Sequence, residues 1–258
     1  MYLKEYEKVE LNYKTYLLAD SRGIPLLKKD SLHGFYNFSA GSDSYEDMER
    51  KLNFLIENSS IERLIITVDD HTLSPYREIK NNSDRSIYFS SASSPTEVYG
   101  LFKDKYINRF FPLLNSKGRD IITLKLFRTK KSKQRKKEKD WDEISEELRI
   151  RKSKNRMAYQ FPDERSSEFL TKSLLRIIKL CEENNIDLYG IKLPLAKEFI
   201  KEQGAKSYGA EKVFERNDIK VLDYMDVYLN KDNFFFNQDH LNEEGGTDLT
   251  KRILKRLN

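Results

Sequence analysis

The sequence predicts an α/β protein in which helices cover both faces of a mainly parallel sheet of about five strands, a three-layer α/β/α sandwich. Short apolar runs alternate along the chain with amphipathic segments, and this alternation is typical of a parallel sheet buried between two helical layers. At 258 residues the chain is long enough for one large domain of this class. We therefore expect residues 1–258 to form a single α/β domain that carries a central insertion at 72–165.

The first half of the chain predicts three strands and one helix. Apolar segments at 15–20, 34–41 and 62–71 predict buried strands, each of which ends in small or polar residues. Residues 44–59 predict a helix, because apolar side chains recur there at helical spacing. The buried face of this helix would consist of Met48, Leu52, Leu55 and Ile56.

The alternation resumes after the insertion. Residues 166–185 predict a strongly amphipathic helix, and a strand follows at 186–194. A short helix at about 196–203 leads to a strand at 219–224, and a last helix at 243–257 completes the domain.

The insertion contains a strongly basic segment at 127–139, FRTKKSKQRKKEK, with eight Lys or Arg and one Glu. The segment carries a charge of +7, which leaves −2 for the rest of a chain whose net charge is +5. No aromatic residues interleave the charges as base-stacking platforms would. We therefore expect an exposed, mobile segment and no specific nucleic acid partner, although it could attract an anionic partner in a salt-dependent way.

Other features of the sequence concern disulfide bonds and the cellular location of the protein. The single cysteine, Cys181, excludes an internal disulfide. No apolar run approaches the roughly 20 residues of a membrane-spanning helix, and no signal peptide is visible. A membrane anchor ahead of residue 1 stays open as an alternative.

Chemically reactive groups gather where the predicted strands end. The groups are Asp20-Ser21-Arg22-Gly23, Ala40-Gly41-Ser42 and Asp69-Asp70-His71, and His240 precedes the last helix. The carboxyl ends of parallel strands meet at one edge of a sheet, so we expect Ser21, Gly41, Asp70 and His240 to share a cleft. Alone, Ser21 could be a helix cap and His240 a solvated side chain. Together they supply the serine and the histidine that acyl transfer needs.

At these positions the sequence resembles the SGNH or GDSL-type hydrolases and acyltransferases. LLADSRG resembles the first block of the family, with Ser21 as the nucleophile, and NFSAGSDS offers Gly41 as the oxyanion glycine of the second block. NQDHLNEEGG resembles the last block through His240, Leu241, Asn242 and Gly245. The resemblance implies a flavodoxin-like sandwich and a Ser–His site without a cofactor. A metal site is not expected either, because adjacent residues of a strand, such as those at 69–71, point to opposite faces.

The last block departs from the family pattern at its acid. Asn237 stands where the family carries an aspartate, three residues before His240. An amide oxygen can orient the imidazole but cannot stabilise the imidazolium, and in the serine-protease template such a change costs about four orders of magnitude in turnover. Asp20 and Asp239 are alternative acids, although the side chains of neighbouring loop residues such as Asp239 and His240 seldom face each other.

The third block also departs, because VDDH replaces the Gly-x-Asn whose asparagine donates to the oxyanion. Asp70 or His71 occupies about that place. A carboxylate would repel the developing charge, so His71 is the better donor, beside the backbone N–H groups of Ser21 or Arg22 and of Gly41.

The sequence therefore predicts a serine esterase or O-acyltransferase that acts on an O-acylated, first of all O-acetylated, carbohydrate of the cell envelope. The resemblance alone implies the carbohydrate and the bacterial cell envelope, and a cytoplasmic location stays open. Asn237 and the VDDH block favour an alternative, a catalytically silent domain that binds a glycan or a partner. A nucleic-acid-binding protein would rest on residues 127–139 alone.

Overall fold

The computed structural model describes residues 9–90, 99, 103 and 140–257. Within them, six strands form one sheet in the order β2-β3-β1-β4-β5-β6. Neighbouring strands are parallel except for β2 and β3, which confirms the expectation of a mainly parallel sheet. The strands are β1 (Thr15–Leu18), β2 (Lys29–Asp30), β3 (Phe35–Asn37), β4 (Arg63–Thr67), β5 (Asp187–Lys192) and β6 (Val221–Asp223).

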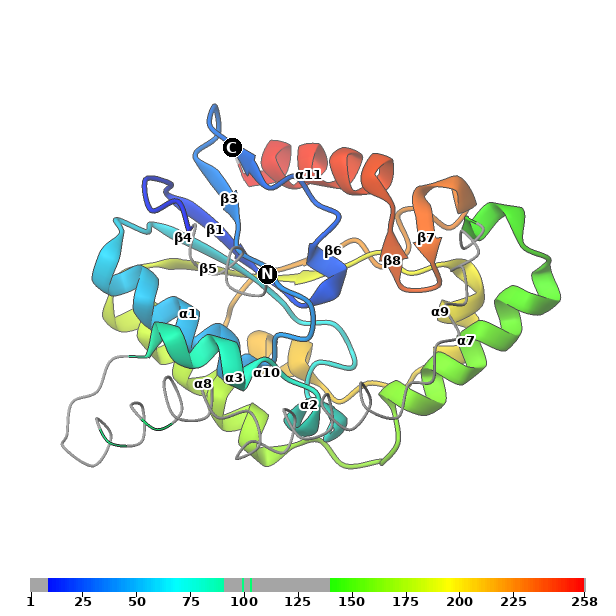
Figure 1. Cartoon of the computed structure of the whole chain (residues 1–258), viewed down its shortest axis with the longest axis horizontal. Coiled ribbons are helices and arrows are strands. Elements are labelled where there is room, and N and C mark those ends of the chain that lie inside the picture. Colours follow the sequence, from blue (N-terminus) through cyan, green and yellow to red (C-terminus); the bar gives the residue numbers. More distant parts are fainter. Residues whose placement is uncertain (1–8, 91–98, 100–102, 104–139, 258) are drawn as a thin grey trace, which may run out of the picture.

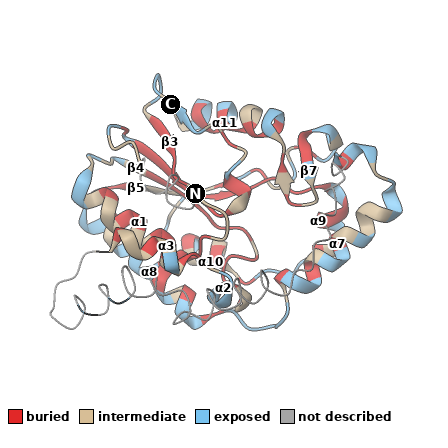
Figure 2. Cartoon of the chain, in the orientation of Figure 1, coloured by how far each residue is buried: buried red, intermediate tan, exposed pale blue. Residues whose placement is uncertain are grey.

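Helices cover both faces of this sheet and complete the expected three-layer sandwich (Figure 1). On one face pack α1 (Tyr45–Asn58), α8 (Glu168–Glu183) and α10 (Ala210–Arg216). On the other face packs α11 (Glu243–Leu257). Figure 2 shows buried residues along the strands and on the inward sides of the helices, so the core lies in two layers, one on each side of the sheet.

The central strand β1 shows why a strand in the middle of this sheet is largely apolar. Tyr16 and Leu18 belong to the core layer under α1 and α8, whereas Leu17 and the following Ala19 belong to the layer under α11. Side chains alternate between the faces of a strand, so a strand covered on both sides needs apolar residues at every position.

Both ends of the predicted insertion pack against the domain. Its first end forms α2 (Tyr76–Ile79) and α3 (Ser83–Ser86), with Arg77 buried. Its last end forms α7 (Glu146–Gln160), which contacts α9 (Lys197–Gln203) through Met157 and Phe199. The basic segment 127–139 lies outside the described residues, so its mobility stays a prediction.

A membrane-spanning helix would have to be both long and apolar. None of the described helices meets that condition.

Gly246, near the start of α11, lies against the backbone that follows the first strand. A Cβ atom at position 246 would stand 2.0 Å from the carbonyl oxygen of Pro25, which no non-bonded contact allows. We therefore expect Gly246→Ala to lower the free energy of unfolding by about 1–3 kcal/mol or more, the usual cost of overpacking. Urea denaturation followed by circular dichroism measures this loss.

Gly41→Ala is the matched control, because the nearest neighbours of its added methyl group would stand at 3.7 and 3.9 Å. It should unfold at nearly the same urea concentration as the parent protein. Equal losses of stability in the two variants would contradict the packing argument.

Candidate active site

Ser21 opens a tight turn, η1 (Ser21–Gly23), which follows β1. Asp20 caps the turn, since its Oδ1 accepts a 2.9 Å hydrogen bond from the Arg22 N–H. Gly23 is required there, because a Cβ atom would lie 2.5 Å from Ser39 Oγ and 2.6 Å from Ala19 Cβ. The turn thus displays Ser21 beyond the carboxyl end of β1, where open α/β sheets carry their working residues.

A short hairpin near the end of the chain brings His240 to Ser21. Its strands are β7 (Phe235–Asn237) and β8 (His240–Leu241), and Asn237 pairs with His240. The His240 Nε2 lies 2.8 Å from the Ser21 Oγ. Two residues that stand 219 positions apart in the sequence therefore form the contact that a nucleophile and its base need.

Two oxygen atoms face the other ring nitrogen of His240. Its Nδ1 lies 3.0 Å from Asn237 Oδ1 and 3.1 Å from Asp239 Oδ1. A carboxylate accepts hydrogen bonds and cannot donate them, so we assign the ring proton to Nδ1. The lone pair of Nε2 then faces the Ser21 hydroxyl and is able to accept its proton.

The expectation that the Asp239 and His240 side chains point apart is wrong. A tight turn brings them together, because the Asp239 N–H donates to Asn237 Oδ1 over 3.1 Å. The Asp239 side chain is fully buried. Burial opposes its ionisation, but the hydrogen bond from His240 and the charges of Arg22 and Arg156 hold the pKa of Asp239 well below its usual range. Asp239 is therefore ionised and accepts the hydrogen bond of the His240 ring.

Three donors hold the second carboxylate oxygen of Asp239. Its Oδ2 accepts hydrogen bonds from Gln160 Nε2 at 2.7 Å, Arg156 Nε at 2.8 Å and Arg22 Nη2 at 3.3 Å. Arg156 and Gln160 belong to α7, which lies within the predicted insertion. The insertion therefore supplies part of the support for this acid.

Arg22 has a different position from the one expected of an oxyanion donor. Its backbone N–H donates to Asp20 Oδ1, which removes it from the reach of an oxyanion. Its guanidinium is buried between Asp69 at 3.1 Å and Asp239 at 3.3 Å. Burial raises the pKa of Asp69 to about 6, although Arg22 acts in the opposite direction.

Asp70 and His71 are both held by other partners, which argues against the oxyanion role expected of either. Asp70 Oδ2 accepts a 2.6 Å hydrogen bond from Gln203, and its Oδ1 lies 3.3 Å from Lys192 Nζ. His71 is buried, and its Nε2 lies 3.2 Å from Asp20 Oδ2. Burial lowers the pKa of His71 to about 4, so its neutral ring donates to that carboxylate. His71 thus supports the turn of the nucleophile through Asp20.

Gly41 lies beside Ser21 in the loop that follows β3. A Cβ atom at position 41 would stand 3.9 Å from Ser21 Cβ and 3.7 Å from Ile24 Cδ1. The Gly41 carbonyl accepts a 2.6 Å hydrogen bond from Asn82 Nδ2. Next in the chain, Ser42 has a φ of 74°, a value that is uncommon outside glycine and that clusters at functional sites. The loop is therefore fixed with Gly41 next to the serine.

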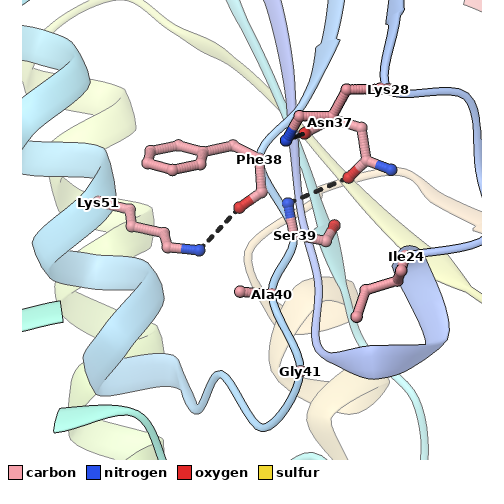
Figure 3. A pocket seen from close by; sticks show the side chains of 8 residues that line it. All are labelled: Ile24, Lys28, Asn37, Phe38, Ser39, Ala40, Gly41 and Lys51. Atoms are coloured by element: carbon pink, nitrogen blue, oxygen red, sulfur yellow. Dashed lines mark hydrogen bonds between the residues drawn. The ribbon is translucent and has the colours of Figure 1, made fainter. Parts of the chain in front are cut away.

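Two adjoining cavities lie around these residues. The larger, of about 710 Å³, is lined by Ser21, His240 and Phe236 among others. The smaller, of about 220 Å³, is lined by Gly41 and its neighbours and is seen from close by in Figure 3. Two side chains line both cavities, Ile24 and Lys28. Ser21 itself lines the larger cavity, and the smaller one lies on the Gly41 side, across Ile24 and Lys28.

The chemistry of the site is that of a nucleophile, a base and an acid. Within the described part of the chain, no group of three or more His, Cys, Asp or Glu side chains could hold a metal ion. Asp69 faces Arg22 and Asp70 faces Lys192, so these two carboxylates do not converge. The arrangement can move a proton from serine to histidine and attack an electrophilic carbon.

The chain matches no protein-family model, and no curated protein sequence matches it. Among the similar solved structures is one from Bacteroides fragilis NCTC 9343 that is described as a "putative acylhydrolase". It is 9% identical, the similarity covers 99% of this chain and 93% of that chain, and the TM-score is 0.46. The assignment of the site therefore rests on the geometry of this chain.

The lowered pKa of His71 makes the stability of the fold depend on pH. The pKa of His71 is about 4 in the folded protein and about 6.5 in an unfolded chain, so between these values the unfolded chain binds more protons. The contribution of this residue is complete above pH 6.5 and is lost as the pH falls towards 4, up to about 3 kcal/mol. Glutamine does not titrate in this range. We therefore expect the free energy of unfolding of His71→Gln to fall less on acidification than that of the parent protein.

Urea denaturation of both proteins at pH 7 and pH 4.5 measures the difference. Asp69, with its pKa raised to about 6, changes stability in the opposite direction, but it does so in both proteins. Equal losses of stability on acidification would show that His71 is not the responsible group.

Proposed function

We propose that this protein is a serine ester hydrolase or O-acyltransferase of the SGNH type, with an O-acylated carbohydrate as its substrate. The observation that supports it most directly is the 2.8 Å contact between Ser21 Oγ and His240 Nε2, with the Asp239 carboxylate 3.1 Å from Nδ1. Nucleophile, base and buried acid in this order are what acyl transfer through a covalent intermediate uses. The sequence blocks that contain Ser21, Gly41 and His240 support the same activity.

In the first half of the proposed reaction, His240 Nε2 takes the hydroxyl proton of Ser21 while Oγ attacks the ester carbonyl carbon. A bond forms between Oγ and this carbon, and the carbonyl oxygen becomes an oxyanion that the backbone N–H groups of Ser21 and Gly41 stabilise. The imidazolium is paired with the Asp239 carboxylate. His240 then gives the proton to the alcohol oxygen as its bond to carbon breaks, which leaves an acyl-serine.

In the second half, a hydroxyl group attacks the acyl-serine. His240 takes the proton of that hydroxyl and returns it to Ser21 Oγ as the acyl bond breaks. With water as the attacking group the product is a carboxylic acid, and with a sugar hydroxyl the acyl group is transferred. The half-exposed Phe236 beside Ser21 offers a flat apolar face of the kind on which sugar rings pack.

We expect the protein to hydrolyse p-nitrophenyl acetate, and Ser21→Ala to lower kcat/KM by about four orders of magnitude or to background, because the nucleophile is lost. A fluorophosphonate probe should label Ser21, as mass spectrometry of the peptides would show. The exposed Ser31 provides the control, since Ser31→Ala should keep both activity and labelling. Activity that survives Ser21→Ala would refute this site. A folded protein with neither activity nor labelling would instead be the silent binding domain.

Asp239 and Asn237 can be compared as partners of the same ring nitrogen. We expect Asp239→Asn to lower kcat by about two to four orders of magnitude, because the imidazolium loses its carboxylate. Asn237→Ala removes a neutral acceptor of the ring and the acceptor of the Asp239 N–H, so it should cost less, about tenfold to a hundredfold. Initial rates with p-nitrophenyl acetate measure both, with thermal melts to show that the variants are folded. A larger loss for Asn237→Ala would make the amide the more important partner.

A further inference from the structure

We propose that the cavity of about 220 Å³ beside Gly41 binds the acyl group of the substrate and restricts it to short chains. We further propose that Ile24 is the wall between this cavity and the larger one. Both inferences rest on the proposed ester chemistry at Ser21. They specify the acyl group of the substrate, which cannot be inferred from the catalytic residues alone.

The place of His240 decides on which side each part of an ester lies. His240 has to protonate the departing alcohol oxygen, so the alcohol lies on the His240 side, in the cavity of about 710 Å³. The oxyanion turns towards the backbone N–H groups of Ser21 and Gly41. The acyl chain is the remaining substituent of the reacting carbon, and we assign to it the cavity that Ala40 and Gly41 line, because the Cβ position of Gly41 is 3.9 Å from Ser21 Cβ.

The volume of this cavity sets the length of the chain. An engineered protein cavity of about 150 Å³ holds benzene, a molecule of six carbon atoms. A saturated chain occupies more volume per carbon atom than an aromatic ring, so a cavity of about 220 Å³ takes acyl groups of up to about six carbon atoms, from acetyl to hexanoyl. An octanoyl group would have to extend beyond it.

Ile24 closes the smaller cavity on the side of the nucleophile turn. Figure 3 shows its side chain directed towards the segment that carries Ala40 and Gly41, and its Cδ1 stands 3.7 Å from the Cβ position of Gly41. Together with Lys28 this side chain lines both cavities, so its truncation would widen the smaller cavity towards the larger one. Ile24 is 55% exposed, so truncation to alanine removes little buried packing and the fold should persist.

The test is the dependence of kcat/KM on acyl length for p-nitrophenyl acetate, butyrate and octanoate. We expect the parent protein to favour butyrate over octanoate by at least about tenfold, and Ile24→Ala to reduce this ratio by at least about fivefold. Phe236→Ala is the matched control, because Phe236 lines only the larger cavity and is 45% exposed. This control should leave the ratio unchanged.

Each other outcome overturns the proposal in an identifiable way. If octanoate is the better substrate, or if Phe236→Ala changes the ratio and Ile24→Ala does not, the acyl chain lies in the larger cavity. If Ser21 is labelled and esters are hydrolysed without regard to chain length, the assignment of the cavity fails while the proposed function stands. If neither hydrolysis nor labelling of Ser21 is seen, the proposed function fails, and the acyl assignment fails with it.

Discussion

The buried guanidinium of Arg22 is the interaction on which the rest of the site depends. It lies between Asp69, which follows β4, and Asp239 of the hairpin, and its side chain is 3% exposed. Charges removed from water are tolerated only when partners surround them, so the ends of β1 and β4 and the hairpin are held together at this point. Because Arg22 directly follows Ser21, the contact that balances the charge of Asp239 also fixes the position of Ser21.

Both ends of the predicted insertion contribute to this arrangement. Arg77 of α2 lies 3.4 Å from Asp20, the residue that caps the nucleophile turn. Arg156 and Gln160 of α7 hold Asp239. Asp20 and Asp239 are both buried carboxylates, and each would be costly without these cations and donors. The segments that the strand–helix alternation does not explain therefore supply part of what stabilises the two buried acids, beside Arg22, His71 and His240.

The sequence predicts the sheet well because strands buried on both faces leave a continuous apolar signal, whereas the edge strand β2 is two polar residues and leaves none. The convergence of Ser21 and His240 follows from topology, since both stand at one edge of a parallel sheet. The contact between Asp239 and His240 was not predicted, because the rule that side chains of adjacent residues point apart assumes an extended backbone. Here the backbone forms a turn that the Asn237 side chain caps. The prediction for His71 is wrong for a related reason. Strand β4 ends at Thr67, and the chain forms a turn at Asp69–Thr72 that buries the His71 side chain.

The asparagine at position 237 then has a physical explanation. Its Oδ1 accepts hydrogen bonds from the Asp239 N–H and from His240 Nδ1, so it holds both the turn and the ring. An aspartate at 237 could accept the same bonds, but it would place a second negative charge beside the carboxylate of Asp239. Two acids at one imidazole nitrogen raise each other's pKa, and the cations Arg22 and Arg156 already pair with Asp239. A neutral amide keeps the geometry without the repulsion, and the carboxylate that faces His240 Nδ1 comes from position 239.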